Sequence, residues 1–281
     1  MKPREIHPRR RIRARGHTLV ELVIAVALGL VVTVGAVSLY RSQRAAFGRA
    51  DDTTQIREAG LTALTLIGQQ IQMTGFVPAD LPQPQPQPQP QQKPTLFGCS
   101  AARPTGTDDN PTCEALTSRS DGIAIRYVGD NVSTWPSSTG QPTDCLGQAV
   151  SVGNAAYGAG RVLIVNRFFA KLSASTGESE LYCDGNGKSG SAQPLVEGVE
   201  RLRARYWLAG AQTALDASAL APDQWANVVA VDLCVLVRGA PQGRRSRYVD
   251  CDGANVAGTD LRARQAFWRR VAIRNNEVSA S

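Results

Sequence analysis

The stretch "RARGHTLVELVIAVALGLVVTVGAVSLY", which runs from Arg13 to Tyr40, decides the fold of this chain. No charged residue occurs between Leu22 and Leu39, and an apolar run of this length suits a helix that spans a membrane. Glu21 nevertheless lies at the start of the apolar block. A carboxylate in lipid costs about 2.5 to 3.5 kcal/mol on insertion scales. We therefore expect this glutamate to have a partner other than lipid.

The positive charge of the chain is concentrated before this stretch. The whole sequence has a formal net charge of +7, from 31 Lys and Arg against 24 Asp and Glu. Residues 1–16 hold seven of the bases and one of the acids, so the remainder is nearly neutral. Lys and Arg on one side of a span mark its cytoplasmic end. We therefore expect a transmembrane segment over about residues 19–40, with everything after Tyr40 outside the cytoplasm.

The cysteines and histidines agree with export and argue against an enzyme. All six cysteines lie beyond the span, and an even number in an oxidising compartment predicts three disulfides, with free thiols as the alternative. No pair has the CxxC spacing of a zinc site or a thioredoxin-like motif. The two histidines, His7 and His17, lie at or before the start of the span. The exported part therefore lacks the histidine of a Ser-His-Asp or Cys-His site, and we expect no catalytic residue, no metal site and no cofactor.

The apolar helix is expected to continue well past the span. No proline occurs between His17 and Val77. We predict one nearly continuous helix from about Thr18 to Thr74, ending near Gly75 and roughly 85 Å long. Its first half would lie in lipid, and its second half would pack on a globular domain. The second half carries apolar residues at intervals of three and four, the period of an amphipathic helix: Ile56, Ala59, Ala63, Leu64, Ile67 and Ile71.

A tract of alternating proline and glutamine, "LPQPQPQPQPQQKP" (Leu81 to Pro94), follows the helix. This composition blocks helix and sheet and favours extended polyproline II. We interpret residues 76–98 as a linker in which the tract is a surface spacer. A recognition arm for a proline-binding partner is the alternative.

Residues 99–281 have the pattern of short strands separated by loops rich in Gly, Asp, Asn and Ser. Strands are expected over "DGIAIRYV" (121–128), "RVLIVNRFFAKL" (161–172), "VERLRARYWL" (199–208), "VVAVDLCVLVRG" (228–239) and "FWRRVAIRN" (267–275). Alternation in the third strand places four apolar side chains on one face: Leu202, Ala204, Tyr206 and Leu208. Alternation in the fourth strand does the same for Val229, Val231, Leu233, Val235 and Val237. The expected fold class is α+β, with the long N-terminal helix packed on an antiparallel β-sheet domain that contains disulfides.

The opening stretch resembles the N-terminus of type IV prepilins, which have a short basic leader, a glycine, and then an apolar helix with glutamate at its fifth residue. In that family a prepilin peptidase cuts after the glycine and methylates the new N-terminus. The resemblance implies a cleaved leader over residues 1–16, cleavage between Gly16 and His17, and N-methylation of His17, where the family usually has phenylalanine. It also implies that Glu21 acts in assembly by neutralising the ammonium of a neighbouring subunit, since either charge alone is costly in apolar surroundings. An ordinary signal peptide or an uncleaved anchor is the alternative, because Val34-Gly35-Ala36 would pass as a signal peptidase site.

A second resemblance covers much of residues 120–276. The segment "LYCDGNGKSGSAQPLVEGVERLRARYW" (181–207) looks like part of the PilW-type minor pilins, as do the strand at 228–239 and the ending "FWRRVAIRNN". The cysteine of "DCLG" (144–147) fits one that precedes this segment in many members. Six cysteines allow 15 pairings. Those that we expect are Cys99–Cys113, Cys145–Cys183 and Cys234–Cys251.

The resemblance implies a type IV pilin-like fold and a role as a minor pilin in type IV pilus assembly or initiation. The chain would be held in the inner membrane by a single span with its C-terminal domain in the periplasm, and would then enter the extracellular pilus or its priming complex. The implied partners are the prepilin peptidase, other minor pilins, the major pilin and a tip adhesin, with twitching motility as a consequence. The alternatives are a type II secretion pseudopilin and a membrane-anchored periplasmic module that binds DNA or another ligand.

Acidic loops and arginine groups are the remaining candidate sites. The loops at 184–190 and 250–260 lack a complete EF-hand ligand series, so we expect solvated turns there. Residues 194–281 hold 12 bases against 9 acids, a surplus too small to predict DNA as a partner. We expect solvated faces at the arginine stripe of Arg201, Arg203 and Arg205 and at the loop cluster of Arg244, Arg245 and Arg247.

Overall fold

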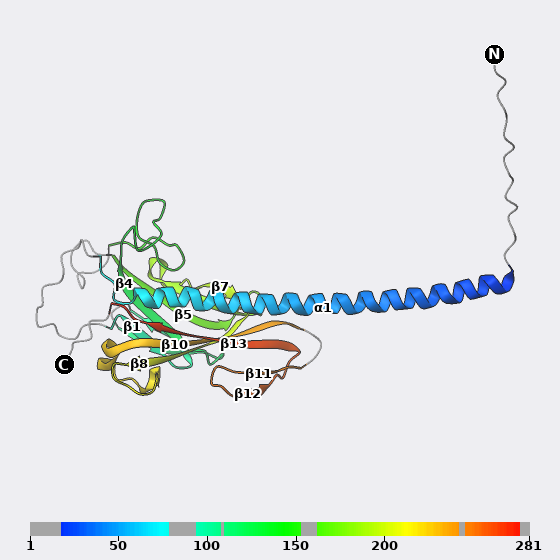
Figure 1. The fold of residues 1–281 in the computed structure, drawn as a ribbon. Coiled ribbons are helices and arrows are strands. Elements are labelled where there is room, and N and C mark those ends of the chain that lie inside the picture. The colour runs from blue at the N-terminus through cyan, green and yellow to red at the C-terminus, as the bar shows by residue number, and fades with distance from the viewer. Residues whose placement is uncertain (1–17, 79–93, 108–109, 153–161, 242–244, 276–281) are drawn as a thin grey trace, which may run out of the picture. The chain divides into compact units, whose positions relative to one another are not determined.

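The computed structural model describes residues 18–78, 94–107, 110–152, 162–241 and 245–275 (Figure 1). The chain divides into two compact units, Met1–Asp51 and Asp52–Ser281. A single helix, α1 (Leu19–Met73), contributes to both units. The predicted long helix is confirmed, with bounds that lie within one or two residues of those expected.

The helix ends in the way that its sequence indicates. Gly75 has φ +72, a left-handed conformation that glycine adopts without steric cost and that commonly terminates helices. Its N–H donates to the carbonyl oxygen of Arg126 at 2.9 Å, so the chain passes from the helix directly onto the sheet.

In the second unit, α1 buries one face. The buried positions recur at the helical period, which confirms the predicted amphipathic pattern, and they are Asp52, Ile56, Gly60, Ala63, Leu64, Ile67, Gly68 and Ile71. Ala59, also expected on this face, is half-buried and packs against the same core. The core cluster combines this face of α1 with side chains of both large sheets.

The first sheet is antiparallel and five-stranded, with the order β1-β4-β5-β6-β7. Its second strand, β4, is buried at every position, since the hairpin of β2 and β3 covers part of the sheet. The bounds of its strands are β1 (Leu96–Cys99), β4 (Gly122–Gly129), β5 (Val162–Leu172), β6 (Ser179–Gly185) and β7 (Gln193–Glu197). The hairpin consists of β2 (Ala102–Gly106) and β3 (Pro111–Ala115).

The second sheet is antiparallel and four-stranded, with the order β13-β10-β8-β9. Its strand β8 lies against β4, β5 and β6 of the first sheet. The bounds are β8 (Val199–Leu208), β9 (Leu215–Asp216), β10 (Val228–Pro241) and β13 (Arg262–Ala272). Beside it lies a hairpin of β11 (Arg247–Val249) and β12 (Asn255–Ala257), and short 3-10 helices η2 (Asn186–Lys188), η3 (Ala217–Ala219) and η4 (Pro222–Asn227) occur in the connections.

The structure differs from the sequence prediction at three places. Val228, not Val229, joins the buried face of β10, because a register shift between Val228 and Ala230 reverses the alternation there. The last strand begins at Arg262, earlier than expected, and ends at Ala272. The first strand begins at Leu96, inside the range expected as linker, because Leu96 pairs with Ile125 and is fully buried.

The helix α1 and strand β13 run side by side in the same direction (Figure 1). The backbone at Gly60 faces the ring of Phe267, and Gly68 faces Val271. Eight helical residues rise about 12 Å and four strand residues about 13 Å, so the two elements keep pace over this stretch. Near the helix end, the amide of Asn275 donates to the carbonyl oxygen of Thr74 at 3.2 Å.

The second unit begins with a buried carboxylate. Asp52 is 5% exposed, and its Oδ1 accepts the backbone N–H of Ala240, at the end of β10, at 2.7 Å. A Cβ at Gly239 would overlap this carboxylate, so a glycine is required there for the backbone to approach it.

The structure contains the three expected disulfides. Cys99–Cys113 ties β1 to the hairpin strand β3, and Cys145–Cys183 ties the loop before β5 to β6. Cys234–Cys251 ties β10 to the turn between β11 and β12. Each bond fixes a loop or hairpin to a strand of one of the two large sheets.

Replacing Gly60 with alanine should destabilise the protein although alanine favours helices. The new methyl would overlap the Phe267 ring. We expect overpacking to lower the free energy of unfolding by about 1 to 3 kcal/mol. Gly68→Ala is the matched control, because its Cβ would meet Val271 at an ordinary 3.4 Å and helix propensity would favour it by up to about 1 kcal/mol. Thermal unfolding of the purified full chain checks both variants, and equal stability of the two would contradict the close approach at Gly60.

Removing the Cys145–Cys183 bond should cost more stability than removing Cys99–Cys113. The two bonds close loops with sequence separations of 38 and 14 residues. Loop-closure entropy predicts losses of about 4 and about 3 kcal/mol, respectively. Chemical unfolding of the paired serine variants measures the difference, and the reverse order would show that local contacts outweigh chain entropy.

Candidate functional site

The predicted cleavage site and the start of α1 lie at the border of the described residues. Gly16 and His17, expected as the cleavage and methylation site, lie outside them. Thr18 is the cap residue, and its Oγ1 accepts the backbone N–H of Glu21 at 3.3 Å. The sequence Thr-x-x-Glu is that of a capping box, and a carboxylate in the first turn favours the positive end of the helix dipole. Glu21 thus has a role within its own helix that the sequence analysis missed.

The apolar stretch of α1 is exposed along its whole length. Every large hydrophobic side chain from Leu19 to Tyr40 keeps between 50% and 78% of its surface accessible. Thr33 is compatible with this apolar surface because its hydroxyl donates to the carbonyl oxygen of Gly29 at 2.8 Å, which satisfies the polar group within the helix. Of the helices in the described part of the chain, α1 is long and apolar enough to cross a membrane. Its exposed apolar surface is consistent with membrane anchoring.

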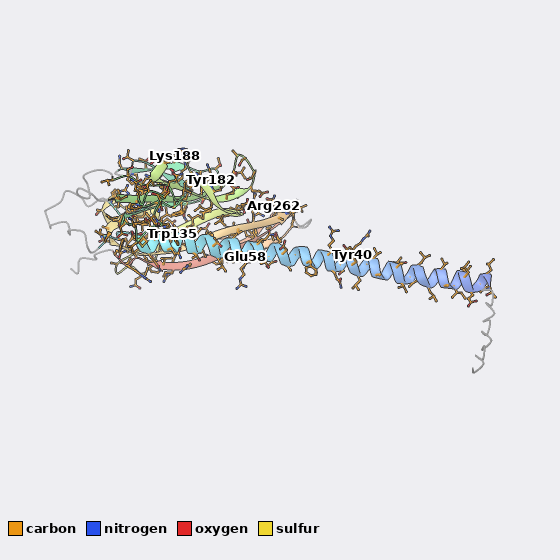
Figure 2. The ribbon with its side chains drawn as sticks, turned by 90° about the horizontal axis from the view of Figure 1, so that it is seen from above. Tyr40, Glu58, Trp135, Tyr182, Lys188 and Arg262 are labelled. Carbon is orange, nitrogen blue, oxygen red and sulfur yellow. A yellow bond between two sulfur atoms is a disulfide. The ribbon has the colours of Figure 1, made fainter. Side chains whose placement is uncertain are left out.

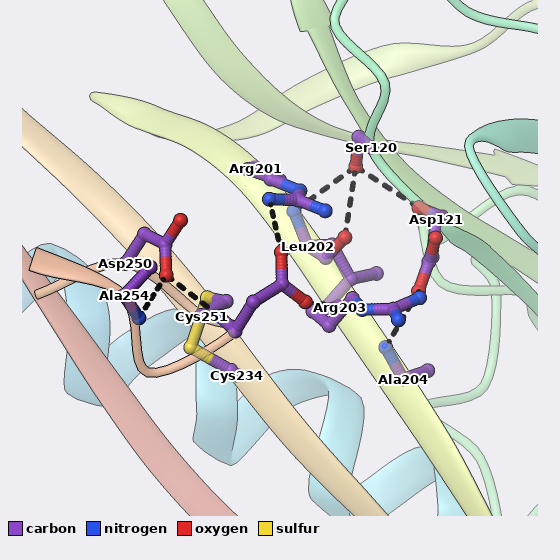
Figure 3. Close-up of a disulfide and its surroundings, with 11 residues drawn as sticks. Ser120, Asp121, Arg201, Leu202, Arg203, Ala204, Cys234, Asp250, Cys251 and Ala254 are labelled. Carbon is purple, nitrogen blue, oxygen red and sulfur yellow. Dashed lines mark hydrogen bonds and ion pairs between the residues drawn. A yellow bond between two sulfur atoms is a disulfide. The ribbon is translucent and has the colours of Figure 1, made fainter. Parts of the chain in front are cut away.

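On the second unit, an ion-pair network surrounds Arg203 (Figure 3). The Arg203 guanidinium contacts the carboxylates of Asp121, Asp216 and Asp252, each at 3.0 Å. Burial alone would lower the pKa of Arg203, but the charge of Asp121 and hydrogen bonds with Asp121 and Asp216 raise it overall. Asp121 also accepts the backbone N–H groups of Ala101 and Ala204, and this joins the start of β4 to β8. The network therefore fixes the two sheets to each other.

The arginine stripe is consequently a solvated face, as expected, only at Arg205, whose side chain is 53% exposed, and not at Arg201 and Arg203. The side chain of Arg203 is 17% exposed, and Arg201 pairs with Asp252 at 2.9 Å. Arg205 donates to the carbonyl oxygen of Ala214. Asp121 and Asp252 come from segments distant in the sequence and Asp216 from the neighbouring strand β9, and alternation within one strand does not reveal these partners.

The arginine loop cluster is only partly described. Arg244 lies outside the described residues. Arg245 lies in the loop before β11, and Arg247 is the first residue of that strand.

The two acidic loops form ordinary turns. Asp184 accepts the backbone N–H of Gly190 at 3.0 Å. Asp250 accepts the backbone N–H groups of Asp252 and Ala254 at 3.0 and 2.9 Å. Among the described residues, no group of three or more His, Cys, Asp or Glu could hold a metal ion.

A cavity at the C-terminal end of α1 is the feature that sequence reasoning missed. It has a volume of about 490 Å³. It lies between the last turns of α1, Tyr127 of β4, the loop at 133–144 and the residues after β13. Its rim includes Trp135, which is 87% exposed and labelled in Figure 2. A tryptophan in the polar loop "DNVSTWPSSTGQ" was the available signal.

Comparisons with known proteins match two segments of the chain. Residues 168–275 match the family described as "Type IV Pilus-assembly protein W", and residues 11–37 match the "Prokaryotic N-terminal methylation motif". Among solved structures, a type IV-like pilin from Thermus thermophilus is similar at 15% identity, with 81% of this chain and 97% of that chain covered and a TM-score of 0.39. No curated protein sequence matches. The two family matches agree with the two sequence resemblances: residues 168–275 are similar to the PilW type IV pilus-assembly proteins, and residues 11–37 are similar to an N-terminal methylation motif.

Proposed function

We propose that this chain is a minor pilin that helps to initiate type IV pilus assembly. In this proposal a prepilin peptidase cuts between Gly16 and His17 and methylates His17. The mature chain waits in the inner membrane with its globular unit in the periplasm, and then enters the pilus or its priming complex. The observation that carries the proposal is the exposed apolar helix with Glu21 in its first turn, within the segment that matches the methylation motif.

The chemistry of the helix start supports assembly with a second subunit. Cleavage would leave an ammonium at His17, four residues before Glu21. A carboxylate and an ammonium in apolar surroundings offset part of each other's desolvation cost when they pair. An ammonium of a neighbouring subunit would give Glu21 such a partner, while the N-terminal turn holds its backbone through Thr18. The other proposed partners are minor pilins, the major pilin and a tip adhesin.

A structural role also explains the charged groups of the globular unit. Its best-connected charged groups, Arg203 with Asp121 and Arg264 with Glu200, join strands and loops to one another. We infer that the unit acts as a rigid body that presents surfaces to other subunits. This interpretation agrees with the match to a family of type IV pilus-assembly proteins.

Mass spectrometry of the mature N-terminus tests the processing step. We expect a chain that begins at methylated His17 in cells with the prepilin peptidase, and a chain that keeps residues 1–16 in cells without it. A mature chain that begins at Val37, after an ordinary signal peptidase cut, would refute the proposal.

Substitution of Glu21 separates its charge from its place in the capping box. Glutamine keeps the hydrogen-bonding capacity of a capping box but removes the charge, whereas alanine removes both. We expect Glu21→Gln to be cleaved and inserted in the membrane, yet to be lost from sheared pilus fractions as completely as Glu21→Ala. Immunoblots of membrane and pilus fractions measure this. Assembly of Glu21→Gln at the wild-type level, with loss of Glu21→Ala alone, would assign Glu21 to helix capping only.

Deletion of the chain distinguishes pilus assembly from type II secretion. Loss of surface pili with normal secretion is the expected result, scored by electron microscopy and by assay of secreted proteins. Normal pili with a secretion defect would identify a pseudopilin instead.

A further inference from the structure

We propose that the cavity at the end of α1 binds a saccharide unit that carries a carboxylate. Its volume of about 490 Å³ lies within the range of small-molecule sites, about 300 to 1,000 Å³. The proposal concerns the second unit alone, and it goes beyond the role in assembly.

Two residues that line the cavity, Gln70 and Tyr127, belong to a polar network with Asn166. The amide of Asn166 donates to Oε1 of Gln70 at 2.8 Å, and its carbonyl oxygen accepts the backbone N–H of Cys145 at 2.9 Å. Burial raises the pKa of Tyr127 to about 12, although its hydrogen bonds with Asn166 and Gln70 act in the opposite direction. The disulfide of Cys145 with Cys183 ties this network to β6. Lining residues that are already fixed lose little conformational entropy when a ligand binds.

The one carboxylate that lines the cavity is already satisfied. Asp144 is 7% exposed, and its Oδ1 accepts the backbone N–H groups of Leu146 and Gln148 at 2.9 and 3.0 Å. Its Oδ2 accepts the N–H of Gly187 at 2.9 Å. These three bonds use most of the roughly four acceptor positions of the carboxylate within the protein, so Asp144 has little capacity left for a ligand.

The rim, in contrast, has unused hydrogen-bonding groups. Within the described part of the chain, the side chains of Gln69, Gln72, Trp135 and Arg274 make no hydrogen bond or ion pair, and all four line the cavity. Each glutamine amide offers two donor hydrogens and an acceptor oxygen, and the guanidinium of Arg274 offers a fork of donors. The rim therefore presents neutral amides and one unpaired positive charge.

The loop that carries Trp135 is held in place although the ring itself is exposed. Oδ1 of Asp130 accepts the backbone N–H groups of Val132 and Ser133 at 3.0 and 2.7 Å. The hydroxyl of Thr143 donates to the carbonyl oxygen of Trp135 at 2.5 Å. The backbone that carries the indole is thus held in place by hydrogen bonds.

These groups together match the chemistry of an acidic sugar. The C–H face of a pyranose can lie on the indole, whose ring face is electronegative, while sugar hydroxyls exchange hydrogen bonds with the amides. A carboxylate on the ring would pair with Arg274 in a charge-assisted, forked hydrogen bond. A neutral sugar would leave Arg274 without an ionic partner, and a cationic ligand would be repelled by the charge of Arg274.

Calorimetric titration of the purified full chain in detergent tests the assignment with trigalacturonic acid and, as the neutral trisaccharide, maltotriose. We expect saturable binding of one trigalacturonic acid per chain, at least about tenfold tighter than maltotriose, because a charge-assisted hydrogen bond is worth about one decade of affinity or more. Trp135→Ala should weaken the binding of trigalacturonic acid by about tenfold or more. Arg274→Gln should reduce its affinity to the level of maltotriose.

Matched controls are present in the same chain. Trp268 is 56% exposed on β13 and does not line the cavity, and Arg57 is exposed on α1 before the cavity begins. Trp268→Ala and Arg57→Gln should leave the affinity unchanged. The proposal is overturned if trigalacturonic acid gives no saturable binding, if the controls weaken it as much as the cavity variants, or if both trisaccharides bind equally. Because the assay needs no pili, its failure would leave the proposed assembly role standing.

Discussion

One helix has to satisfy two different surroundings, and the rest of the structure depends on this constraint. Up to Tyr40, α1 exposes every large apolar side chain, whereas from Asp52 onward it buries a single face, which consists of small and aliphatic residues apart from Asp52 itself. Glycines at positions 60 and 68 let the backbone approach β13 closely enough for helix and strand to advance together. The sheets, the hairpins and the disulfides then complete the enclosure of that face. A change of residue type along one continuous helix therefore separates the anchoring surface from the folded core.

Much of this fold could be predicted from the sequence because its strongest signals are local. The absence of proline, the helical period after residue 55 and the alternation in β8 all act over a few residues, and each is present in the structure. What could not be predicted depends on contacts between distant segments. The shift at Val228 reflects pairing with β8, and the strand at Leu96 exists because β4 offers it a partner.

The candidate sites show the same division. The motif around Glu21 could be read directly because its residues are consecutive, although its capping by Thr18 was missed. Arg201 and Arg203 were interpreted wrongly as solvated, because Asp252 and Asp121 contact them from positions about 50 residues after and 80 residues before. The cavity was not predicted for a similar reason, since its wall combines α1, β4, a loop and the residues after β13. Sequence patterns identify helices and strands, whereas a site built from distant segments can be identified only when the topology of the fold is known.

The contact between Asp52 and the end of β10 has a mechanical consequence. A pulling force on α1 would act on the second unit first at Asp52, whose carboxylate accepts the backbone N–H of Ala240. Strand β10 lies in the middle of its sheet, paired over most of its length with β8 on one side and β13 on the other. A load passed from this carboxylate to β10 would therefore be divided between two ladders of backbone hydrogen bonds.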